Sequence, residues 1–128
     1  MIVLDSSAAI DWLIELDNGP WVDERIRGED VHAPHVLDIE VVGVVRKRVQ
    51  RKELTLQRAT AALSDFVDFN LARHPHTLLL GRMWELRANF TASDAAYVAL
   101  AELLGAALVT TDSRLARAPG IRARIVAP

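Results

Sequence analysis

The sequence predicts an α/β fold built around a mostly parallel sheet of four to five strands flanked by helices. Short apolar runs, such as residues 1–4 and 107–111, alternate with longer segments whose apolar residues recur at helical spacing. Parallel strands need crossover connections, and amphipathic helices between short strands supply them. We therefore expect helices to outnumber strands.

The chain begins with a strand followed by two helices. Residues 1–4 form a continuous apolar run, typical of a strand that is buried on both faces. Ser6 or Ser7 is the expected N-cap of the first helix, because hydroxyl side chains accept hydrogen bonds from free amide groups at helix starts. Residues 18–20 (Asn-Gly-Pro) end this helix, and a second short helix closes at Gly28.

The middle of the chain is mostly helical. A brief strand is expected at residues 31–33, and a long helix from beyond Pro34 to about Gln50. Another helix begins near Thr55 and gives way to a third strand around Leu71.

The last part of the chain returns to strands. After a helix at residues 77–87, residues 95–104 are apolar nearly all round, which indicates a central buried helix, and Gly105 stops it. A strand at residues 107–111 leads into a short helix containing Leu115, and residues 125–126 are a candidate edge strand.

Size and composition predict one domain spanning residues 1–128. The chain has 128 residues, of which 51% are hydrophobic, and it has no apolar run long enough to cross a membrane. Because no signal-peptide pattern follows Met1, we expect a cytoplasmic protein without membrane contact. The absence of cysteine excludes disulfides, thiolate ligands and a cysteine nucleophile. A net charge of -2 does not attract nucleic acid globally, so an RNA contact would need a local basic patch.

Two aspartates directly follow apolar strands. Asp5 and Asp112 should project from the carboxyl edge of the sheet, where open α/β proteins bind their ligands. Ser6, Thr111 and Ser113 lie beside them and are candidates to orient a carboxylate or a water. The alternative is that all five residues are ordinary turn or cap residues.

Two further acids belong to helices. Glu40 shares the inner stripe of its helix with Leu37 and Val41, so its carboxylate needs a cation, a hydrogen-bond network or a raised pKa. Asp94 opens the buried helix at its amino end, and with Thr91 three residues earlier it also fits a capping box. An ion pair with an arginine, or a position at the edge of the stripe that is still exposed to water, would equally account for Glu40.

Convergence of Asp5, Glu40, Asp94 and Asp112 would require a metal. Two carboxylates ~4 Å apart repel by about 4 kcal/mol at an effective dielectric near 20, so such a cluster needs a cation. Oxygen-only ligands favour Mg²⁺ or Mn²⁺ over Zn²⁺. A hard divalent ion held by carboxylates supports hydrolysis of phosphodiesters.

Four segments of the sequence resemble the ordered motifs of VapC-type PIN domains. They are residues 3–8 (Val-Leu-Asp-Ser-Ser-Ala), 33–40 (Ala-Pro-His-Val-Leu-Asp-Ile-Glu), 93–102 (Ser-Asp-Ala-Ala-Tyr-Val-Ala-Leu-Ala-Glu) and 108–115 (Leu-Val-Thr-Thr-Asp-Ser-Arg-Leu). The resemblance implies a three-layer α/β/α PIN domain and a Mg²⁺-dependent endoribonuclease, with Asp5, Glu40, Asp94 and Asp112 as metal-binding and catalytic acids. One departure is Ser93, where many relatives carry an aromatic residue.

The resemblance also implies partners and a biological role. Such proteins are toxins of toxin–antitoxin pairs: they cut RNA, inhibit translation and growth, form homodimers, and are silenced by a VapB-like antitoxin in a heterotetramer or larger assembly.

The densest basic run, residues 46–52, follows the helix that carries Glu40. Candidate RNA contacts in and beyond it are Arg46, Arg48, Arg51 and Arg87, with Arg82 and Arg114 as weaker candidates. The alternative for the run is a solvated helix end whose cations complement the helix dipole.

The histidines and tryptophans receive structural interpretations. We expect His32, His35, His74 and His76 to be surface or loop residues, since nothing in the sequence brings them beside the acids. The three tryptophans are interpreted as core or dimer contacts.

Two alternative functions stay open. A receiver-like or phosphatase-like domain also places acids at strand ends, but it needs a lysine after a late strand, where this sequence has residues 113–115 (Ser-Arg-Leu). A non-catalytic PIN interaction module would keep the fold and only bind a partner.

Overall fold

A computed structural model describes residues 1–128 and contains a five-stranded sheet in the order β3-β2-β1-β4-β5. All four strand pairings are parallel. The strands are β1 (Ile2–Leu4), β2 (Val31–Pro34), β3 (Leu71–His74), β4 (Ala107–Val109) and β5 (Ile125–Val126). This sheet confirms the predicted fold class.

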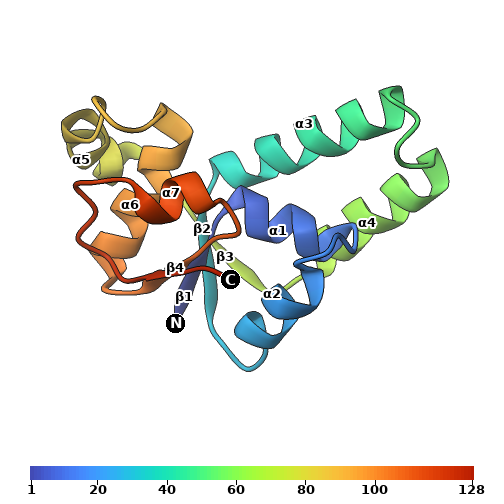
Figure 1. The fold of residues 1–128 in the computed structure, drawn as a ribbon, viewed down its shortest axis with the longest axis horizontal. Helices are drawn as coiled ribbons and strands as arrows, with labels where there is room; N and C mark the ends of the chain where they lie inside the picture. The colour runs from blue at the N-terminus through green and yellow to red at the C-terminus, as the bar shows by residue number, and fades with distance from the viewer.

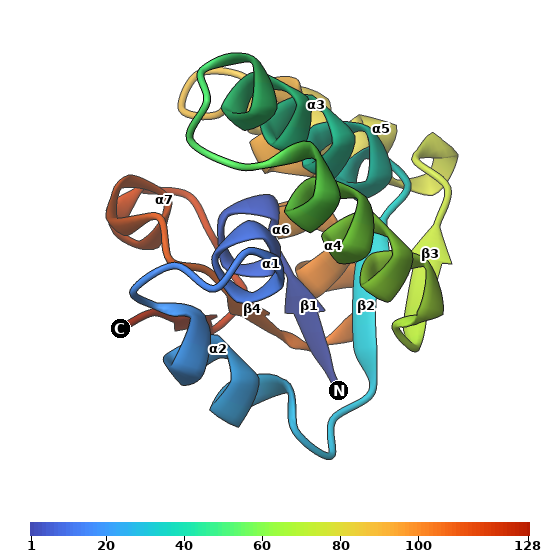
Figure 2. The same ribbon diagram turned by 90° about the vertical axis from the view of Figure 1, so that its right-hand side faces the viewer.

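Helices cover both faces of the sheet in three layers. They are α1 (Ser6–Leu13), α2 (Gly19–Ile26), α3 (Val36–Gln50), α4 (Leu56–Asp68), a 3-10 turn (Thr77–Leu79), α5 (Leu80–Glu85), α6 (Ala92–Leu104) and α7 (Ser113–Arg117). The first four helices lie on one side of the sheet, and α5 and α6 lie on the other (Figures 1 and 2). The α3–α4 hairpin extends from the body as an arm (Figure 1). No helix is both long and apolar enough to cross a membrane.

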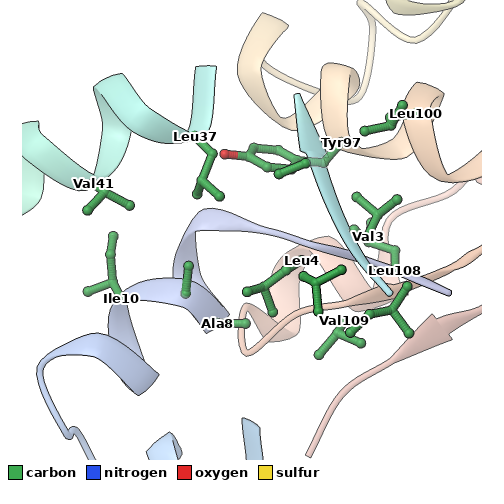
Figure 3. Packing of buried hydrophobic residues seen from close by; sticks show 14 of the residues in the cluster. Val3, Leu4, Ala8, Ile10, Leu37, Val41, Tyr97, Leu100, Leu108 and Val109 are labelled. Atoms are coloured by element: carbon green, nitrogen blue, oxygen red, sulfur yellow. The ribbon is translucent and has the colours of Figure 1, made fainter. Parts of the chain in front are cut away.

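The core lies around the central strands and the buried helix α6. Every residue of β1 and β4 is buried, and so is the run from Ala95 to Ala101 in α6. Figure 3 shows Tyr97 and Leu100 of α6 near Val3 and Leu37, with Tyr97 reaching between the sheet and α3. Each fully buried large aliphatic side chain contributes roughly 1.5–3 kcal/mol to folding, so this packing fixes α6 firmly.

The strand order creates a ligand-binding position beside β1. From β1 the chain adds β2 and β3 on one side, and it later adds β4 and β5 on the other. Ligands of open parallel sheets bind where the strand order reverses in this way, at the carboxyl ends of the strands. Asp5 and Asp112 follow the two strands on either side of that point.

The helix starts differ from expectation in one respect. Asp5, and not Ser6 or Ser7, is the N-cap of α1: its backbone is extended and its side chain accepts a hydrogen bond from the Ala8 amide. Ser6 and Ser7 are the first two residues of the helix. Helix α6 starts at Ala92 under a Thr91 cap, as the capping pattern predicts.

Candidate active site

Asp5 is the most buried of the four acids and is held by three short-range hydrogen bonds. Its carboxylate Oδ1 accepts from the Ser7 hydroxyl at 2.7 Å and the Ala8 amide at 3.0 Å, and Oδ2 accepts from the Thr110 hydroxyl at 2.6 Å. Only 3% of the residue is exposed, and no basic side chain contacts it. The sequence therefore places a fixed, unneutralised carboxyl group at the end of β1.

Thr110 links Asp5 to Asp112. Its Oγ1 donates to Asp5 and accepts from the Asp112 amide at 3.0 Å. The Ser7 hydroxyl oxygen in turn accepts from the Thr111 amide at 3.2 Å. The turns after β1 and β4 are thus bonded to each other, which fixes the two aspartates relative to one another.

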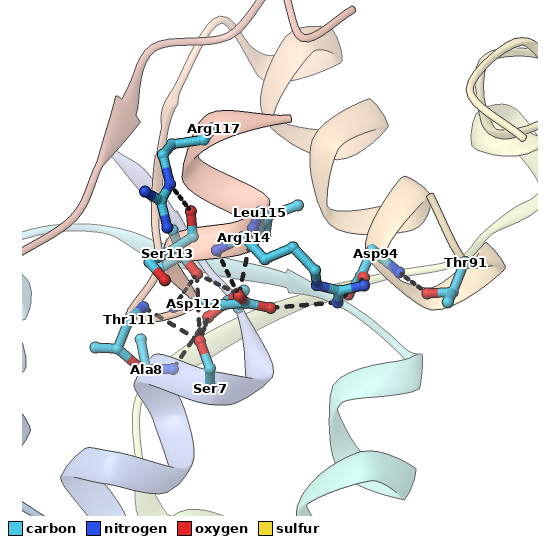
Figure 4. A network of polar contacts seen from close by, with 12 residues as sticks. Ser7, Ala8, Thr91, Asp94, Thr111, Asp112, Ser113, Arg114, Leu115 and Arg117 are labelled. Atoms are coloured by element: carbon cyan, nitrogen blue, oxygen red, sulfur yellow. Dashed lines mark hydrogen bonds and ion pairs between the residues drawn. The ribbon is translucent and has the colours of Figure 1, made fainter. Parts of the chain in front are cut away.

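Asp112 caps α7 and lies near Asp94 of α6. Its Oδ1 accepts from the amides of Arg114 at 2.9 Å and Leu115 at 3.3 Å. One guanidinium nitrogen of Arg114, Nη2, lies 3.4 Å from Asp112 Oδ2 and 3.3 Å from Asp94 Oδ2 (Figure 4). Because one nitrogen reaches both carboxylates, Asp94 and Asp112 are neighbours.

Glu40 enters the site from the other side, on α3. The Tyr97 hydroxyl donates to Glu40 Oε1 at 2.6 Å, and the Ser6 hydroxyl is a second hydrogen-bonding neighbour of this carboxylate. Tyr97 and Asp94 both belong to α6, three residues apart, and therefore lie on the same face of that helix. The arginine partner considered as an alternative for Glu40 is absent, since none of the ion pairs involves it.

The pKa values of Asp5, Glu40 and Tyr97 are raised, chiefly by burial and to a smaller degree by neighbouring acids. Burial raises the pKa of Asp5 to about 6, against the lowering effect of its hydrogen bonds, and the charge of Asp112 raises it further. Burial is also the main reason that the pKa of Glu40 is raised, and Asp94 adds to it. The pKa of Tyr97 is raised by burial and by its bond to Glu40, with a contribution from Asp5. Asp5 is thus coupled to Asp112 and Glu40 to Asp94, while Tyr97, which is bonded to Glu40, also responds to the charge of Asp5.

Of the three hydroxyl residues that the sequence indicated beside the acids, only Ser6 acts on one of them through its side chain. Ser6 lies near Glu40 and Tyr97, and it lowers the pKa of both groups. Thr111 contributes only its backbone amide, and Ser113 accepts from Arg117 through its carbonyl. The hydroxyls that bind Asp5 belong to Ser7 and Thr110, which our sequence analysis did not select.

The four acids offer suitable ligand atoms for a metal ion, but their side chains are not yet arranged around one. All four side chains offer only carboxylate oxygens, the ligands that Mg²⁺ and Mn²⁺ prefer. As the side chains stand, no three of them lie close enough to hold one ion. Arg114 occupies the space between Asp94 and Asp112, but its side chain is 75% exposed. An exposed ion pair contributes about 0–1 kcal/mol, so a divalent ion can displace this guanidinium at little cost.

The candidate RNA-binding arginines lie in two places. Arg46 and Arg51 are exposed on the far part of the α3–α4 arm, where Arg48 lies 3.8 Å from Glu53. Arg87 lies next to α5, with its guanidinium 4.5 Å from the centre of the Trp84 ring.

Of the two weaker candidates for RNA contact, Arg82 is engaged elsewhere. It binds Glu102 through two nitrogens, at 2.7 and 3.2 Å, and also the Gly120 carbonyl. Arg114 lies among the acids instead, as described above.

Two tryptophans pack against the core, and the third keeps its interpretation as a dimer contact. Trp12 stacks on Phe69 and donates to Asp23, and Trp21 packs against the core. Trp84 is 68% exposed, so it is not a core residue.

The histidines form no hydrogen bond or ion pair with the four acids, but His32 and His74 lie in strands and are half-buried, so for these two the expected surface or loop position was wrong. The rings of His32 and His74 share a hydrogen bond, and the pKa of His74 is lowered by burial and by the neighbouring His32 and His35.

The chain matches the PIN domain family over residues 2–121. Ribonuclease VapC12 of Mycobacterium tuberculosis is 41% identical over 125 residues, which cover 98% of this chain and 97% of the relative. Ribonuclease VapC9 of the same organism is 42% identical over 115 residues, or 90% of this chain and 88% of the relative.

Two solved structures share the fold. The crystal structure of PAE2754 from Pyrobaculum aerophilum has a TM-score of 0.69 at 23% identity, covering 97% of this chain and 81% of that one. VapC20 of Mycobacterium tuberculosis, described as a sarcin-ricin loop cleaving toxin, has a TM-score of 0.66 at 14% identity, covering 90% and 92%. At these identities the likeness concerns the fold alone.

Proposed function

Since this chain belongs to the PIN-domain family and its relatives are VapC-type ribonucleases, we propose that it is a metal-dependent endoribonuclease and the toxin of a toxin–antitoxin pair. The observation that supports this most directly is that Asp5 with Asp112, and Glu40 with Asp94, form two coupled pairs around the strand-order reversal, with Arg114 as their one basic contact. We also propose that residues 1–128 form a single PIN domain.

The proposed cofactor is Mg²⁺, with Mn²⁺ as a substitute. A buried carboxylate without a cation is costly, and a hard divalent ion relieves that cost while matching the oxygen-only donor set. Asp5, Glu40, Asp94 and Asp112 would hold it. The chemistry that such an ion supplies when bound is a lowered pKa of water and neutralised charge on a phosphoryl oxygen.

Other residues of the chain would position the acids and accept a proton from water. Ser7 and Thr110 hold both oxygens of Asp5, so this carboxylate stays fixed when RNA binds. Tyr97 holds Glu40 Oε1 and so orients this carboxylate to accept a proton from water in the site. Because the pKa of Glu40 is raised, its carboxylate is a better proton acceptor than an ordinary surface glutamate.

RNA would approach along the exposed carboxyl edge of the sheet and the α3–α4 arm. Arg46, Arg48 and Arg51 follow Glu40 along α3 by six to eleven residues, which spans about 9–16 Å at 1.5 Å per residue. Phosphate contacts from these residues would add affinity without sequence preference, and Arg87 is a further candidate contact.

Protein partners belong to the same proposal. The names of the relatives support a VapB-like antitoxin as inhibitor, in a heterotetramer or larger complex. Exposed apolar side chains on α3 and α5, among them Ile39, Val42 and Trp84, support a homodimer. An RNA substrate and such an antitoxin imply action in the cytoplasm, with inhibition of translation and growth when the antitoxin is missing.

Cleavage of RNA by the purified protein tests the proposal. We expect cutting with Mg²⁺ or Mn²⁺ and a loss of at least a hundredfold in Asp94→Asn, whose partly exposed side chain can change without disturbing the core. Asp65→Asn is the matched control, because Asp65 is exposed on α4 and forms no ion pair. Full activity of Asp94→Asn would refute the site. A folded protein with no activity under any of these conditions would favour the interaction module.

A further inference from the structure

All four histidines of the chain gather at one corner of the fold, where β2 and β3 end. His32 belongs to β2 and His74 to β3, the edge strand beside it. Their rings meet through His32 Nδ1 and His74 Nε2, which lie 2.8 Å apart. His35 follows β2 directly and His76 lies two residues after the end of β3, with ring centres 6.0 Å apart. The proposed nuclease chemistry uses none of them.

We propose that His32 and His74 bind a divalent transition-metal ion of the Zn²⁺, Ni²⁺ or Cu²⁺ class, at a site separate from the four acids. Imidazole nitrogens suit these ions, whereas Mg²⁺ prefers oxygen. The two rings come from adjacent parallel strands, with His32 paired to Ala72 and Pro34 to His74, so the two residues are offset by two positions and their rings meet diagonally across the strands. The site is therefore largely arranged before the metal binds.

The distance between His32 Nδ1 and His74 Nε2 needs only a small change for both nitrogens to bind one ion. Zinc–nitrogen distances of about 2.0–2.1 Å and a tetrahedral angle place two ligand nitrogens about 3.3 Å apart. The rings would have to separate by about half an ångström from their present contact. The terminal torsion of a histidine side chain is soft, so rotation of the rings can direct both lone pairs toward one ion.

The surroundings favour nitrogen and water as the ligands. Asp38 of the nearby helix α3 already forms an ion pair with Arg73. The Arg73 Nε lies 2.9 Å from both carboxylate oxygens of Asp38. Arg73 precedes His74 on β3, and successive side chains of a strand point to opposite faces. No third histidine or acid lies close enough to serve as a ligand, so water would complete the coordination.

Binding at this corner would also stabilise it. His76 Nε2 accepts from the Val36 amide at 3.1 Å, which joins the segment after β3 to the start of α3. A metal shared by His32 and His74 would join edge strand β3 to β2 at the same corner. We therefore expect the ion to raise the midpoint of thermal unfolding of the whole chain.

Calorimetric titration with Zn²⁺ in excess Mg²⁺, which occupies the acids, tests the inference. One Zn²⁺ per chain is expected to bind, with affinity at least tenfold weaker in His32→Gln and in His74→Gln, and unchanged in the control Asp112→Asn. If the two histidines only form a hydrogen bond between strands, both variants lower stability and leave Zn²⁺ binding as it was, which overturns the proposal.

A second measurement needs no variant. The electron paramagnetic resonance spectrum of Cu²⁺ bound to the intact chain should show hyperfine coupling to nitrogen from two imidazoles. A spectrum typical of oxygen ligands alone would overturn the proposal even if the histidine variants failed to fold.

Discussion

Asp5 has the most buried carboxyl group of the four acids. Its surroundings oppose each other in their effect on the charged carboxylate. Hydrogen bonds from Ser7, Ala8 and Thr110 favour the charged form, but burial outweighs them and raises its pKa from 3.8 to about 6. Ser7 and Thr110 could not be selected from the sequence, because they meet only when β1 and β4 become neighbours. Asp5 itself could be selected, since an acid that ends a buried strand is conspicuous without any tertiary information.

This pKa predicts how stability depends on pH in the metal-free protein. Between pH 4 and 6 the folded chain keeps a proton on Asp5 that the unfolded chain has lost, so the free energy of unfolding falls as pH rises. Urea unfolding measured in the presence of a chelator should show this effect. From pH 4 to 7, the free energy of unfolding of Asp5→Asn should rise relative to that of wild type by up to about 3 kcal/mol. A difference between the two proteins that stays constant over this range would contradict the account.

Tyr97 is expected to act as a positioning residue for Glu40. In Tyr97→Phe the ring still packs in the core, but Glu40 Oε1 loses its donor, so the pKa of Glu40 rises further. We expect a loss of about 1–2 kcal/mol in stability and a shift of the acidic limb of the cleavage–pH profile to higher pH.

The control for this shift is Phe66→Leu, in the core contact of α4. It should lower stability to a similar degree and leave the pH profile in place. If Tyr97→Phe also leaves the profile in place, the hydroxyl has only a structural role.

At the scale of elements, two of the acids are also helix caps. Asp5 caps α1 and Asp112 caps α7, each through Oδ1, so the backbone of each turn directs the carboxylate toward the sheet edge. The sequence indicated the helices well, because periodic apolar residues determine where a helix forms. It could not identify the first cap, because Asp5, Ser6 and Ser7 are three adjacent capping residues and only the backbone conformation separates them.

Substitutions at Asp112 should separate capping from charge. Serine caps helices about as well as aspartate, so Asp112→Ser should stay within about 0.5 kcal/mol of wild type, whereas Asp112→Ala should lose about 1 kcal/mol. Both variants should lose RNA cleavage. Urea unfolding and cleavage rates measured on the same samples would decide, and an active Asp112→Ser would mean that the carboxylate serves only the helix.

At the scale of the whole molecule, the acids come together because of strand order. The sequence predicted parallel strands but not their arrangement, and only the arrangement β3-β2-β1-β4-β5 places β1 beside β4 with α3 and α6 on opposite faces. The exposure of Trp84 and the gathering of the histidines depend on the same long-range packing. Local sequence patterns do not contain this information, because each of these three features depends on contacts between residues that are distant in sequence.

The central claim is that the four carboxylates bind one hard-metal centre, and anomalous scattering from Mn²⁺-soaked crystals tests it most directly. The account predicts an anomalous peak contacted by oxygens of Asp5, Asp94 and Asp112, with Glu40 in direct or water-mediated contact and Arg114 displaced. A peak elsewhere, or Arg114 still joined to Asp94 and Asp112 at saturating Mn²⁺, would contradict it.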